Sequence, residues 1–409
     1  MKWTNPGHQL DDLGARYLKV KNLYIYGRDK KLSSFLQWLD VEGDFRITYV
    51  LTARAVGGNL RDKYLRHEEV PAFRGKRVIS FGRMCSELRE GPEESVVVLG
   101  SPGQTGLVEK LEKIGFHNIF YMGSGINRRD NFIQNFLCVW LMYRRGKLLS
   151  HWENFLPTSK CNLNCRGCLN CTGYIKEPKD VDFEDFKENV DLLFSKFDYL
   201  YSFHFSGGEP LLAKNLIECI RYLQENYKDR IFEFFVITNG TIVPSEEQIL
   251  AVKSMNGFFD IDDYSHSIPG AKVDVIKAKL DACGVKYITT TAASWYDLEM
   301  GKADNSGLSE ETLIRWKDDC NSYLHDFGER RLYACCYQQY AARAGISVSD
   351  PENDYIEIAD TPKMEILEFR QGYTHKGYVS LCRHCLGLGG HAKKIPPAEQ
   401  IPKVQKGEG

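Results

Sequence analysis

The side chains of this sequence best suited to bind a metal are its cysteines. The 409-residue chain contains 13 cysteines, and most of them fall into two groups. The first group is Cys161, Cys165, Cys168 and Cys171, and the second is Cys320, Cys335, Cys336, Cys382 and Cys385. The chain begins without the apolar segment of a secretory signal, so we expect a cytoplasmic protein whose thiols stay reduced. Clustered thiols in such a protein indicate metal binding rather than disulfides.

The first group has the spacing CxxxCxxC, which lets three thiolates converge from one loop. Structural zinc sites use four ligands, commonly as two CxxC pairs far apart in the sequence. Three close cysteines instead fit an iron–sulfur cluster with one iron left open to a further ligand. Cys171 as a fourth thiolate would close the site, and this alternative stays open.

A second segment with chemical potential is the run Gly207-Gly208-Glu209-Pro210, which follows a predicted strand over Tyr199–Phe205. Two glycines let a backbone approach a ligand closely, and a carboxylate accepts hydrogen bonds from an ammonium group. The alternative is a structural turn in which Glu209 lies near a helix N-terminus, where acidic residues are favourable.

The two segments together resemble the radical S-adenosylmethionine (SAM) enzymes. The resemblance implies a [4Fe–4S] cluster held by Cys161, Cys165 and Cys168, whose open iron binds the amino and carboxylate groups of SAM. It implies reductive cleavage of SAM to a 5′-deoxyadenosyl radical, which takes a hydrogen atom from the substrate. The SAM-binding residues that it implies in the second segment are Gly207, Gly208, Glu209 and Pro210. The family usually has an aromatic residue just before the third cysteine, where this chain has Gly167.

Two further strand ends provide cofactor-binding candidates. Thr238-Asn239-Gly240 resembles the family's segment at the cofactor ribose. Asp260 and Asp262 share one face of the next predicted strand by alternation and can face the barrel interior. We take Asn239 and Asp262 as candidates, with helix capping after each strand as the alternative.

The second cysteine group contains a CxxC pair, Cys382 and Cys385. With Cys320 and either Cys335 or Cys336, it supplies four thiolates, which fit zinc or a closed [4Fe–4S] cluster. The layout resembles the auxiliary-cluster extension of radical SAM enzymes called SPASM, in its shortened twitch form with one extra cluster. We choose Cys335 because the preceding residues resemble a ligand-bearing hairpin strand, which turns Cys336 to the opposite face.

Alternating strands and helices must position these residues. Near the N-terminus the predicted strands are 21–26, 46–51, 76–81, 95–100 and 118–122, with helices over 32–39 and 105–114. This alternation predicts a Rossmann-like α/β domain. Its first turn, 26–30, has one glycine, and 101–103 is an equally weak match, so a scaffold or docking role is favoured over nucleotide binding.

The alternation resumes with longer units after a linker helix over 131–143. The predicted strands are 152–156, 199–205, 232–238, 258–262 and 286–290, and the helices are 183–197, 211–226, 245–255 and 271–282. Both strong motifs then lie in loops after strands, as in a (β/α) barrel. We therefore predict an α/β protein with a Rossmann-like domain over 1–130, a partial (β/α)6 radical SAM barrel over 131–300, a small twitch- or SPASM-like domain over 301–395 and a disordered tail over 396–409.

Charge and hydropathy exclude two classes of partner. The charge sum is 53 − 55 = −2, so no global positive field favours nucleic acid. No run approaches the roughly 18 apolar residues of a membrane helix.

From the resemblance we expect an oxygen-sensitive enzyme with two [4Fe–4S] clusters that dehydrogenates an alcohol on a sugar, nucleotide sugar or cyclitol-like molecule. An auxiliary cluster suits oxidation because it can accept an electron from the substrate radical. Epimerisation, which needs a hydrogen donor, and modification of a peptide are the alternatives. The non-enzymatic alternative, an iron–sulfur or zinc binding module, leaves the GGEP segment unexplained. An external one-electron donor such as flavodoxin or ferredoxin is implied, and the sequence does not indicate the catalytic residue.

Overall fold

A computed structural model describes residues 1–26, 35, 38–39, 43–50, 69–73, 75–100, 105–122, 131–320, 326–388 and 392–402. The chain forms two compact units. One is Leu10–Lys147, and the other joins Met1–Gln9 to Leu148–Gly409. The predicted linker helix therefore belongs to the first unit, as η2 (Phe132–Leu137) and α6 (Cys138–Arg145). No helix in the described part of the chain is long and apolar enough to span a membrane.

The unit Leu10–Lys147 contains a six-stranded sheet in the order β3-β4-β2-β1-β5-β6. The strands are β1 (Asn22–Tyr26), β2 (Arg46–Val50), β3 (Glu69–Phe73), β4 (Lys76–Ile79), β5 (Ser95–Leu99) and β6 (Ile119–Tyr121). All neighbours are parallel except β3 and β4. The sequence did not predict β3, because its run carries Pro71, which weakens a strand pattern except at a sheet edge.

The helices described in this unit include α1 (Asp11–Tyr17), α4 (Phe81–Glu90) and α5 (Thr105–Glu112). The strand predicted over 76–81 ends early, because Ser80 caps α4 by accepting a hydrogen bond from the Arg83 N–H. Most of the predicted helix 32–39 and of the two glycine-containing turns lies outside the described residues.

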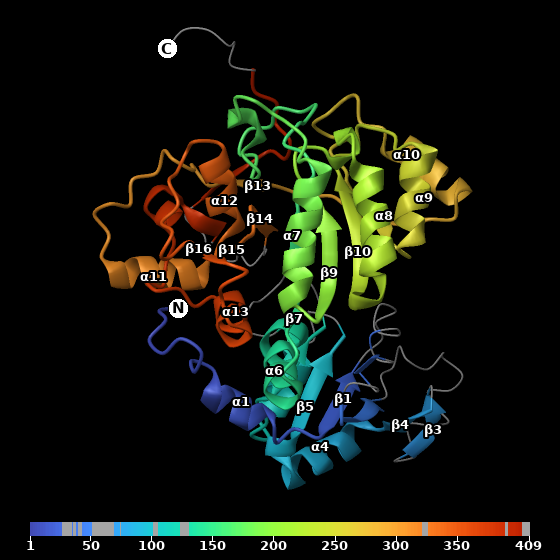
Figure 1. The fold of residues 1–409 in the computed structure, drawn as a ribbon. Helices are drawn as coiled ribbons and strands as arrows, with labels where there is room; N and C mark the ends of the chain where they lie inside the picture. Colours follow the sequence, from blue (N-terminus) through green and yellow to red (C-terminus); the bar gives the residue numbers. More distant parts are fainter. Residues whose placement is uncertain are drawn as a thin grey trace. The chain divides into compact units, whose positions relative to one another are not determined.

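The second unit is built on a parallel sheet in the order β12-β11-β10-β9-β7, with β8 also pairing with β9 (Figure 1). The strands are β7 (Leu149–Ser150), β8 (Glu153–Phe155), β9 (Tyr199–Phe205), β10 (Ile231–Thr238), β11 (Phe258–Asp262) and β12 (Lys286–Thr290). Between them run α7 (Phe183–Lys196), α8 (Leu216–Asn226), α9 (Glu246–Ser254) and α10 (Val273–Ala282). The predicted α/β class with a parallel sheet is confirmed.

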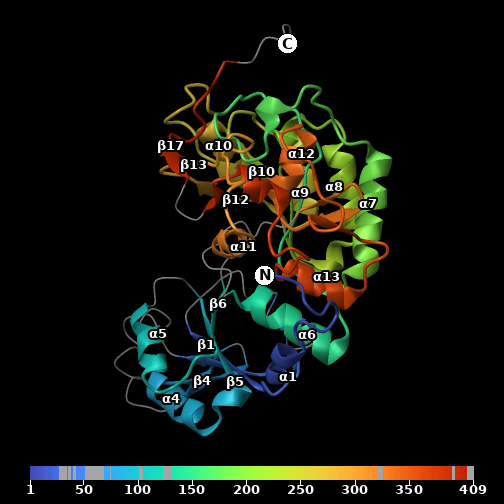
Figure 2. The same ribbon diagram turned by 90° about the vertical axis from the view of Figure 1, so that its left-hand side faces the viewer.

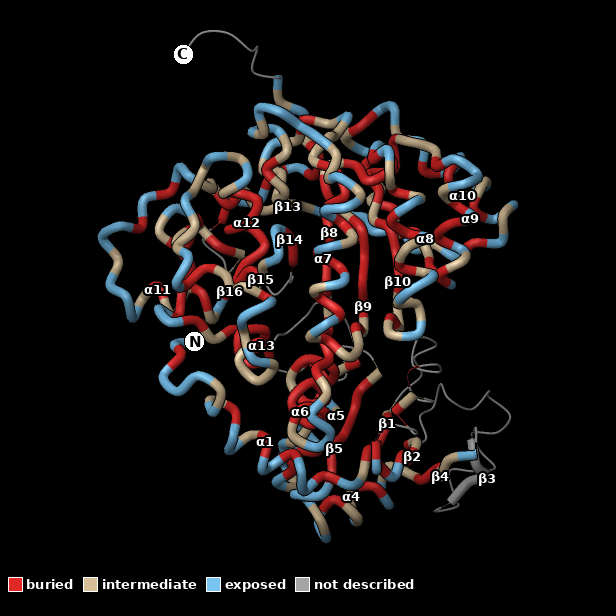
Figure 3. The backbone as a smooth tube through the Cα atoms, viewed as in Figure 1, coloured by how far each residue is buried: buried red, intermediate tan, exposed pale blue. Residues whose placement is uncertain are grey.

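The register of this sheet brings its loops to one edge. Asn154 pairs with His204, and Phe205 pairs with Val236. Because parallel strands all end at the same edge, the segments after β8, β9, β10 and β11 meet there. The interiors of β9 and β10 are largely buried, whereas the helices keep an exposed face (Figure 3).

The elements after the sheet are short. They are β13 (Trp295–Asp297), α11 (Glu310–Asp319), β14 (Phe327–Gly328), β15 (Arg331–Tyr333), α12 (Cys336–Arg343), β16 (Tyr355–Glu357), α13 (Lys363–Arg370), η6 (Ser380–His384) and β17 (Lys393–Ile395). A buried ion pair of 2.7 Å between Arg370 and Glu153 ties α13 to β8. Residues 396–402 correct the prediction of a disordered tail, because they are described and Ala398 is fully buried. Residues 403–409 lie outside the described part.

Candidate active site

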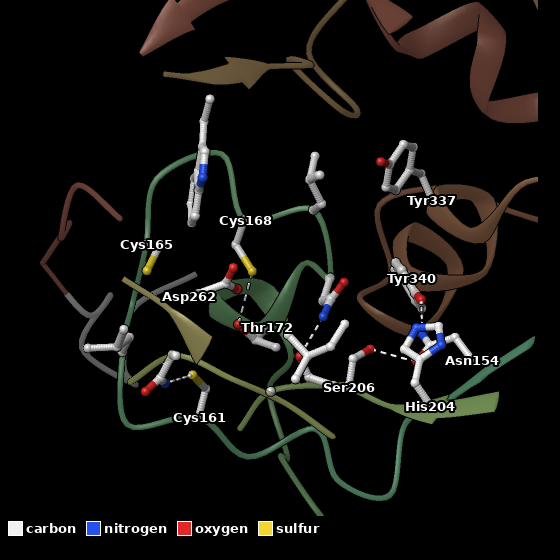
Figure 4. A pocket seen from close by; sticks show the side chains of 18 of the residues that line it. Asn154, Cys161, Cys165, Cys168, Thr172, His204, Ser206, Asp262, Tyr337 and Tyr340 are labelled. Atoms are coloured by element: carbon white, nitrogen blue, oxygen red, sulfur yellow. Dashed lines mark hydrogen bonds between the residues drawn. The ribbon is translucent and has the colours of Figure 1, made fainter. Parts of the chain in front are cut away.

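A cavity of about 350 Å³ lies where the strand ends meet. Three of the predicted cluster ligands, Cys161, Cys165 and Cys168, line it, together with Tyr337 and Tyr340 of α12. Figure 4 shows the three cysteines on one side and the two tyrosines on the other. Residues far apart in the sequence thus surround one space at the edge of the sheet.

The three cysteines come from the loop that follows β8. Burial, the largest influence, raises the pKa of Cys161 to about 11 and the pKa of Cys165 to about 12. Metal binding would therefore have to displace their protons. Among the described residues, no three His, Cys, Asp or Glu side chains converge closely enough to hold a single metal ion. A cluster places its irons at separate corners, so its thiolates do not have to meet at one point.

Cys171, the alternative fourth ligand, does not line the cavity. It is fully buried, and its Sγ lies 3.8 Å from the Leu169 carbonyl and 4.0 Å from Met300 Sδ. The structure therefore brings three of the four cysteines of the first group to the cavity.

The two glycines of the second motif pack against the chain just before Cys161. The Gly208 N–H donates to the Thr158 carbonyl at 3.1 Å, and the Glu209 N–H donates to the Lys160 carbonyl at 2.8 Å. A Cβ at Gly208 would overlap the Lys160 carbonyl oxygen, and Gly207 has a φ of +135°. The motif needs glycine here because two backbones touch.

We expect Gly208→Ala to displace the cysteine loop, because the methyl group meets backbone rather than a movable side chain. After anaerobic reconstitution, we expect the variant to bind at least severalfold less of the iron assigned to the cluster of this loop. Gly270→Ala is the matched control, since a Cβ there meets nothing within 4 Å. Equal iron uptake by both variants would show that the close contact does not support the loop.

Glu209 and Pro210 are buried behind the cavity and do not line it. The Glu209 carboxylate accepts hydrogen bonds from Thr238 Oγ1 at 2.9 Å, from the Asn239 N–H at 2.8 Å and from the Leu211 N–H at 3.2 Å. Burial raises the pKa of Glu209 to about 7, against these hydrogen bonds. Pro210 begins the short helix η4 (Pro210–Leu212). Glu209 thereby joins the GGEP segment to the strand end that carries Asn239.

Asn239 and Asp262 both line the cavity. The Asn239 amide donates to Asn162 Oδ1 at 3.0 Å and faces Cys161 Sγ at 3.8 Å. Asp262 accepts a hydrogen bond of 2.9 Å from Tyr264, and burial raises its pKa to about 7. Asp260 accepts a hydrogen bond from Thr290.

A polar end of the cavity was missed by the sequence reasoning. His204 is 2% exposed, lines the cavity and stacks on Phe235, with ring centroids 4.7 Å apart. Its Nδ1 is buried and has no hydrogen-bond partner. Burial lowers the pKa of His204 to about 3, so the ring is neutral. No local pattern marks His204, because it sits inside the buried strand β9.

Beside His204, a buried network joins β8 to α12. Asn154 Nδ2 donates to both carboxylate oxygens of Asp326 at 3.2 Å and to the Tyr340 hydroxyl at 3.0 Å. Tyr340 also donates to Asp326, and Ser206 donates to Asn154 Oδ1 at 2.8 Å. Burial raises the pKa of Asp326 to about 7 despite these donors.

This raised pKa predicts a pH dependence of stability. The contribution of neutral Asp326 is fully present below its ordinary pKa of 3.8 and is lost as pH rises through about 7. The pKa change corresponds to about 4 kcal/mol at most, of which about 2–3 kcal/mol falls between pH 5 and pH 8. We expect Asp326→Asn to lose correspondingly less unfolding free energy than wild type over this range, measured on cluster-free protein. Asp274→Asn, at an exposed position, should follow wild type, and identical pH dependences for all three would contradict the prediction.

The second cysteine group also comes together in the fold. Burial raises the pKa of Cys382 to about 12, and the neighbouring thiols of Cys335 and Cys320 raise it further. Burial likewise raises the pKa of Cys385, and the thiols of Cys335, Cys382 and Cys320 raise it further. Cys335 is the extended residue that caps α12, and Cys336 is the first, fully buried residue of that helix. The Gly387 N–H donates to Cys385 Sγ at 3.3 Å and the Leu388 N–H donates to Cys320 Sγ at 3.5 Å, so Cys320 lies beside the CxxC pair.

Two supporting residues of this group were not predicted. The Asn305 side chain donates to the carbonyls of both Cys382 and Cys385 at 2.9 Å, which holds the CxxC turn closed. Lys317 is 3% exposed and acts on Cys382 as a positive charge that lowers its pKa. Both positions depend on tertiary contacts, so no sequence spacing indicates them.

A comparison with protein families matches residues 155–288 to the Radical SAM superfamily. This part of the chain is a radical SAM domain. The matched residues include the CxxxCxxC loop, the GGEP segment, Asn239 and Asp262, whereas the four-cysteine group lies beyond them. A radical SAM domain is expected to use SAM and one [4Fe–4S] cluster.

Three individual proteins are also similar to parts of this chain. An uncharacterised protein of Methanocaldococcus jannaschii, MJ0907, is 38% identical over 87 residues, which is 21% of this chain and 29% of that protein. The chain therefore spans less than a third of this relative. Among solved structures, BtrN in complex with AdoMet and 2-DOIA is 19% identical, with a TM-score of 0.38 over 62% of this chain and 98% of BtrN. Streptococcus suis SuiB bound to the precursor peptide SuiA is 16% identical, with a TM-score of 0.29 over 47% of this chain and 45% of SuiB.

Proposed function

We propose that this protein is an enzyme that cleaves SAM reductively and uses the 5′-deoxyadenosyl radical to take hydrogen from a small-molecule alcohol, which it oxidises. The proposal starts from the radical SAM domain and from the three thiols that line the cavity. A bound [4Fe–4S] cluster would supply the electron that breaks the carbon–sulfur bond of SAM. The chain's own part is to hold the ligands, orient SAM and substrate, and exclude water.

The donor set of the cavity fits such a cluster. Cys161, Cys165 and Cys168 would hold it, because three soft thiolates on one loop leave one iron open. Next to them the backbone of Gly207 and Gly208 borders the cavity, and Asn239 and Asp262 add polar side chains. These groups form a cradle for a ligand with both ammonium and hydroxyl groups, as SAM has.

The observation that carries the oxidation proposal is the position of Tyr337. This residue lines the cavity and is itself 4% exposed. Burial raises the pKa of its hydroxyl most, and the thiols of Cys336, Cys335, Cys320 and Cys385 raise it further. Tyr337 directly follows Cys335 and Cys336 in the chain, so a second [4Fe–4S] cluster that includes Cys335 would lie next to the cavity wall and provide an electron acceptor close to the substrate.

The cavity wall also carries polar side chains that suit a substrate with hydroxyl groups. Asn154, His204 and Ser206 line the cavity beside Tyr340. Trp152 and Phe235 hold the His204 ring in place, with ring centroids 4.4 and 4.7 Å away. A sugar, nucleotide sugar or cyclitol carries such hydroxyls.

Two features extend the proposal to partners and location. A reducing, cytoplasmic setting suits a chain whose 13 cysteines include two groups assigned to metal sites. SAM cleavage needs an external one-electron donor, and flavodoxin or ferredoxin are the candidates. Peptide modification is the alternative substrate class, and no nucleic-acid or membrane partner is proposed.

Oxidation and epimerisation can be separated by the mass of the product formed in D2O. Reconstituted protein, SAM, dithionite and candidate polyols with ordinary hydrogen at carbon are incubated in D2O without oxygen. Oxidation predicts a ketone product and 5′-deoxyadenosine formed in equal amounts. A product of unchanged oxidation state that has gained deuterium from D2O would overturn oxidation in favour of epimerisation.

A further inference from the structure

A segment near the C-terminus, residues 393–401, crosses the loop that carries the three cysteines; we call it the C-terminal strap. It begins as β17, which pairs antiparallel with β13 (Figure 2). It then bonds to the loop itself. The Arg166 N–H donates to the Glu399 carbonyl at 2.7 Å, and the Ile401 N–H donates to the Asn164 carbonyl at 2.9 Å.

The strap is packed against the cysteine loop as well as hydrogen-bonded to it. Ala398 is fully buried in an apolar cluster with Tyr264 and Ile268, against which Cys165 packs. A Cβ at Gly167 would lie 2.7 Å from Ile395 Cδ1, so the strap occupies the space beside the third cysteine. These contacts hold the strap close to the sulfur atoms of the loop.

The side chain of Gln400 connects the strap to a predicted cluster ligand. Its Oε1 accepts a hydrogen bond of 2.8 Å from the Asn164 N–H. Because a backbone N–H can only donate, this contact fixes which end of the amide is oxygen. Nε2 then donates to the Ala398 carbonyl at 2.8 Å and to Cys165 Sγ at 3.1 Å. Both N–H groups are used, and one of them points at sulfur.

We propose that Gln400 is a positioning residue that sets the reduction potential of the cluster through Cys165. An N–H group donated to a ligand sulfur stabilises the added negative charge of the reduced state, so it raises the potential. Gln400 is exposed, so in a variant without its amide group water can replace part of the hydrogen bond to Cys165. The inference rests on the proposed cluster at Cys161, Cys165 and Cys168.

The variant with the largest expected effect is Gln400→Glu, which keeps an acceptor for the Asn164 N–H, removes the donors to Cys165 Sγ and to the Ala398 carbonyl, and adds a negative charge. The full-length protein is reconstituted with iron and sulfide and titrated redox-potentiometrically. The electron paramagnetic resonance signal that changes on SAM addition identifies the cluster of the radical SAM domain. We expect the ratio of reduced to oxidised cluster at a given potential to fall about tenfold, or about 59 mV for one electron.

Gln400→Leu removes the donor without adding charge and should lower the ratio about threefold, which corresponds to about 28 mV. Glu399→Gln is the matched control, because Glu399 faces Arg166 and not a sulfur; its potential should equal that of wild type. Equal potentials in wild type and both Gln400 variants, with equal iron content, would overturn this inference and leave the proposed function standing. A wild-type protein that binds no cluster would instead overturn the proposed function, and this inference with it.

Discussion

Cys165→Ala should abolish the formation of 5′-deoxyadenosine from SAM. Cys165 is one of three thiols that line the cavity, and its loss leaves two thiolates, which cannot hold a cluster of four irons. We expect iron to fall from about eight to about four per chain, because the second cysteine group keeps its own metal. Iron, sulfide and 5′-deoxyadenosine are measured after anaerobic reconstitution.

The control for this variant is Cys171→Ala. Cys171 belongs to the same sequence cluster but is buried away from the cavity, so its loss should leave both cleavage and most of the iron in place. SAM cleavage at the wild-type rate by Cys165→Ala would contradict the ligand assignment. Loss of cleavage in Cys171→Ala alone would shift the assignment to that residue.

Combined Cys382→Ala and Cys385→Ala substitution should separate SAM cleavage from product formation. The double variant lacks two of the four thiols assigned to the second cluster, so we expect it to lose about four irons per chain. The radical SAM domain keeps its three cysteines, so 5′-deoxyadenosine should still form. Oxidised product should vanish, because the substrate radical loses its nearby electron acceptor.

Controls must show that this double variant still folds, because a metal held by four cysteines also stabilises its domain. Circular dichroism measures the fold, and Cys336→Ala serves as a matched substitution in the same region that should keep all the iron. One zinc per chain in wild type, lost in the double variant, would make the second site structural. The oxidation proposal would then fail in favour of a redox-neutral reaction.

The strands of the parallel sheet were predictable because they are short segments rich in aromatic and β-branched residues, separated by helical patterns. The predicted bounds of β9, β11 and β12 agree with the structure, and β10 begins one residue earlier. Pairs of strand and helix patterns specify a parallel sheet without further information. By contrast, β7 has two residues, Leu149 and Ser150, and gives no periodic signal.

The site was predictable where ligands share one loop or follow neighbouring strands of the sheet. The spacing of Cys161, Cys165 and Cys168 encodes their convergence, whereas His204 and Asn305 act through contacts between distant segments. Gln400 reaches Cys165 over 235 positions of sequence, from a segment whose polar, proline-containing composition suggested disorder. Amino-acid composition does not show that Ala398 is buried in the apolar cluster against which Cys165 packs.

The central claim is that the three thiols of the cavity hold a cluster that cleaves SAM. The most direct test incubates the reconstituted wild-type protein with SAM and dithionite without oxygen and measures 5′-deoxyadenosine by liquid chromatography and mass spectrometry. The account predicts that 5′-deoxyadenosine forms, even slowly and without substrate, and that it is absent without dithionite. Iron-loaded protein that binds SAM and yields no 5′-deoxyadenosine would contradict it.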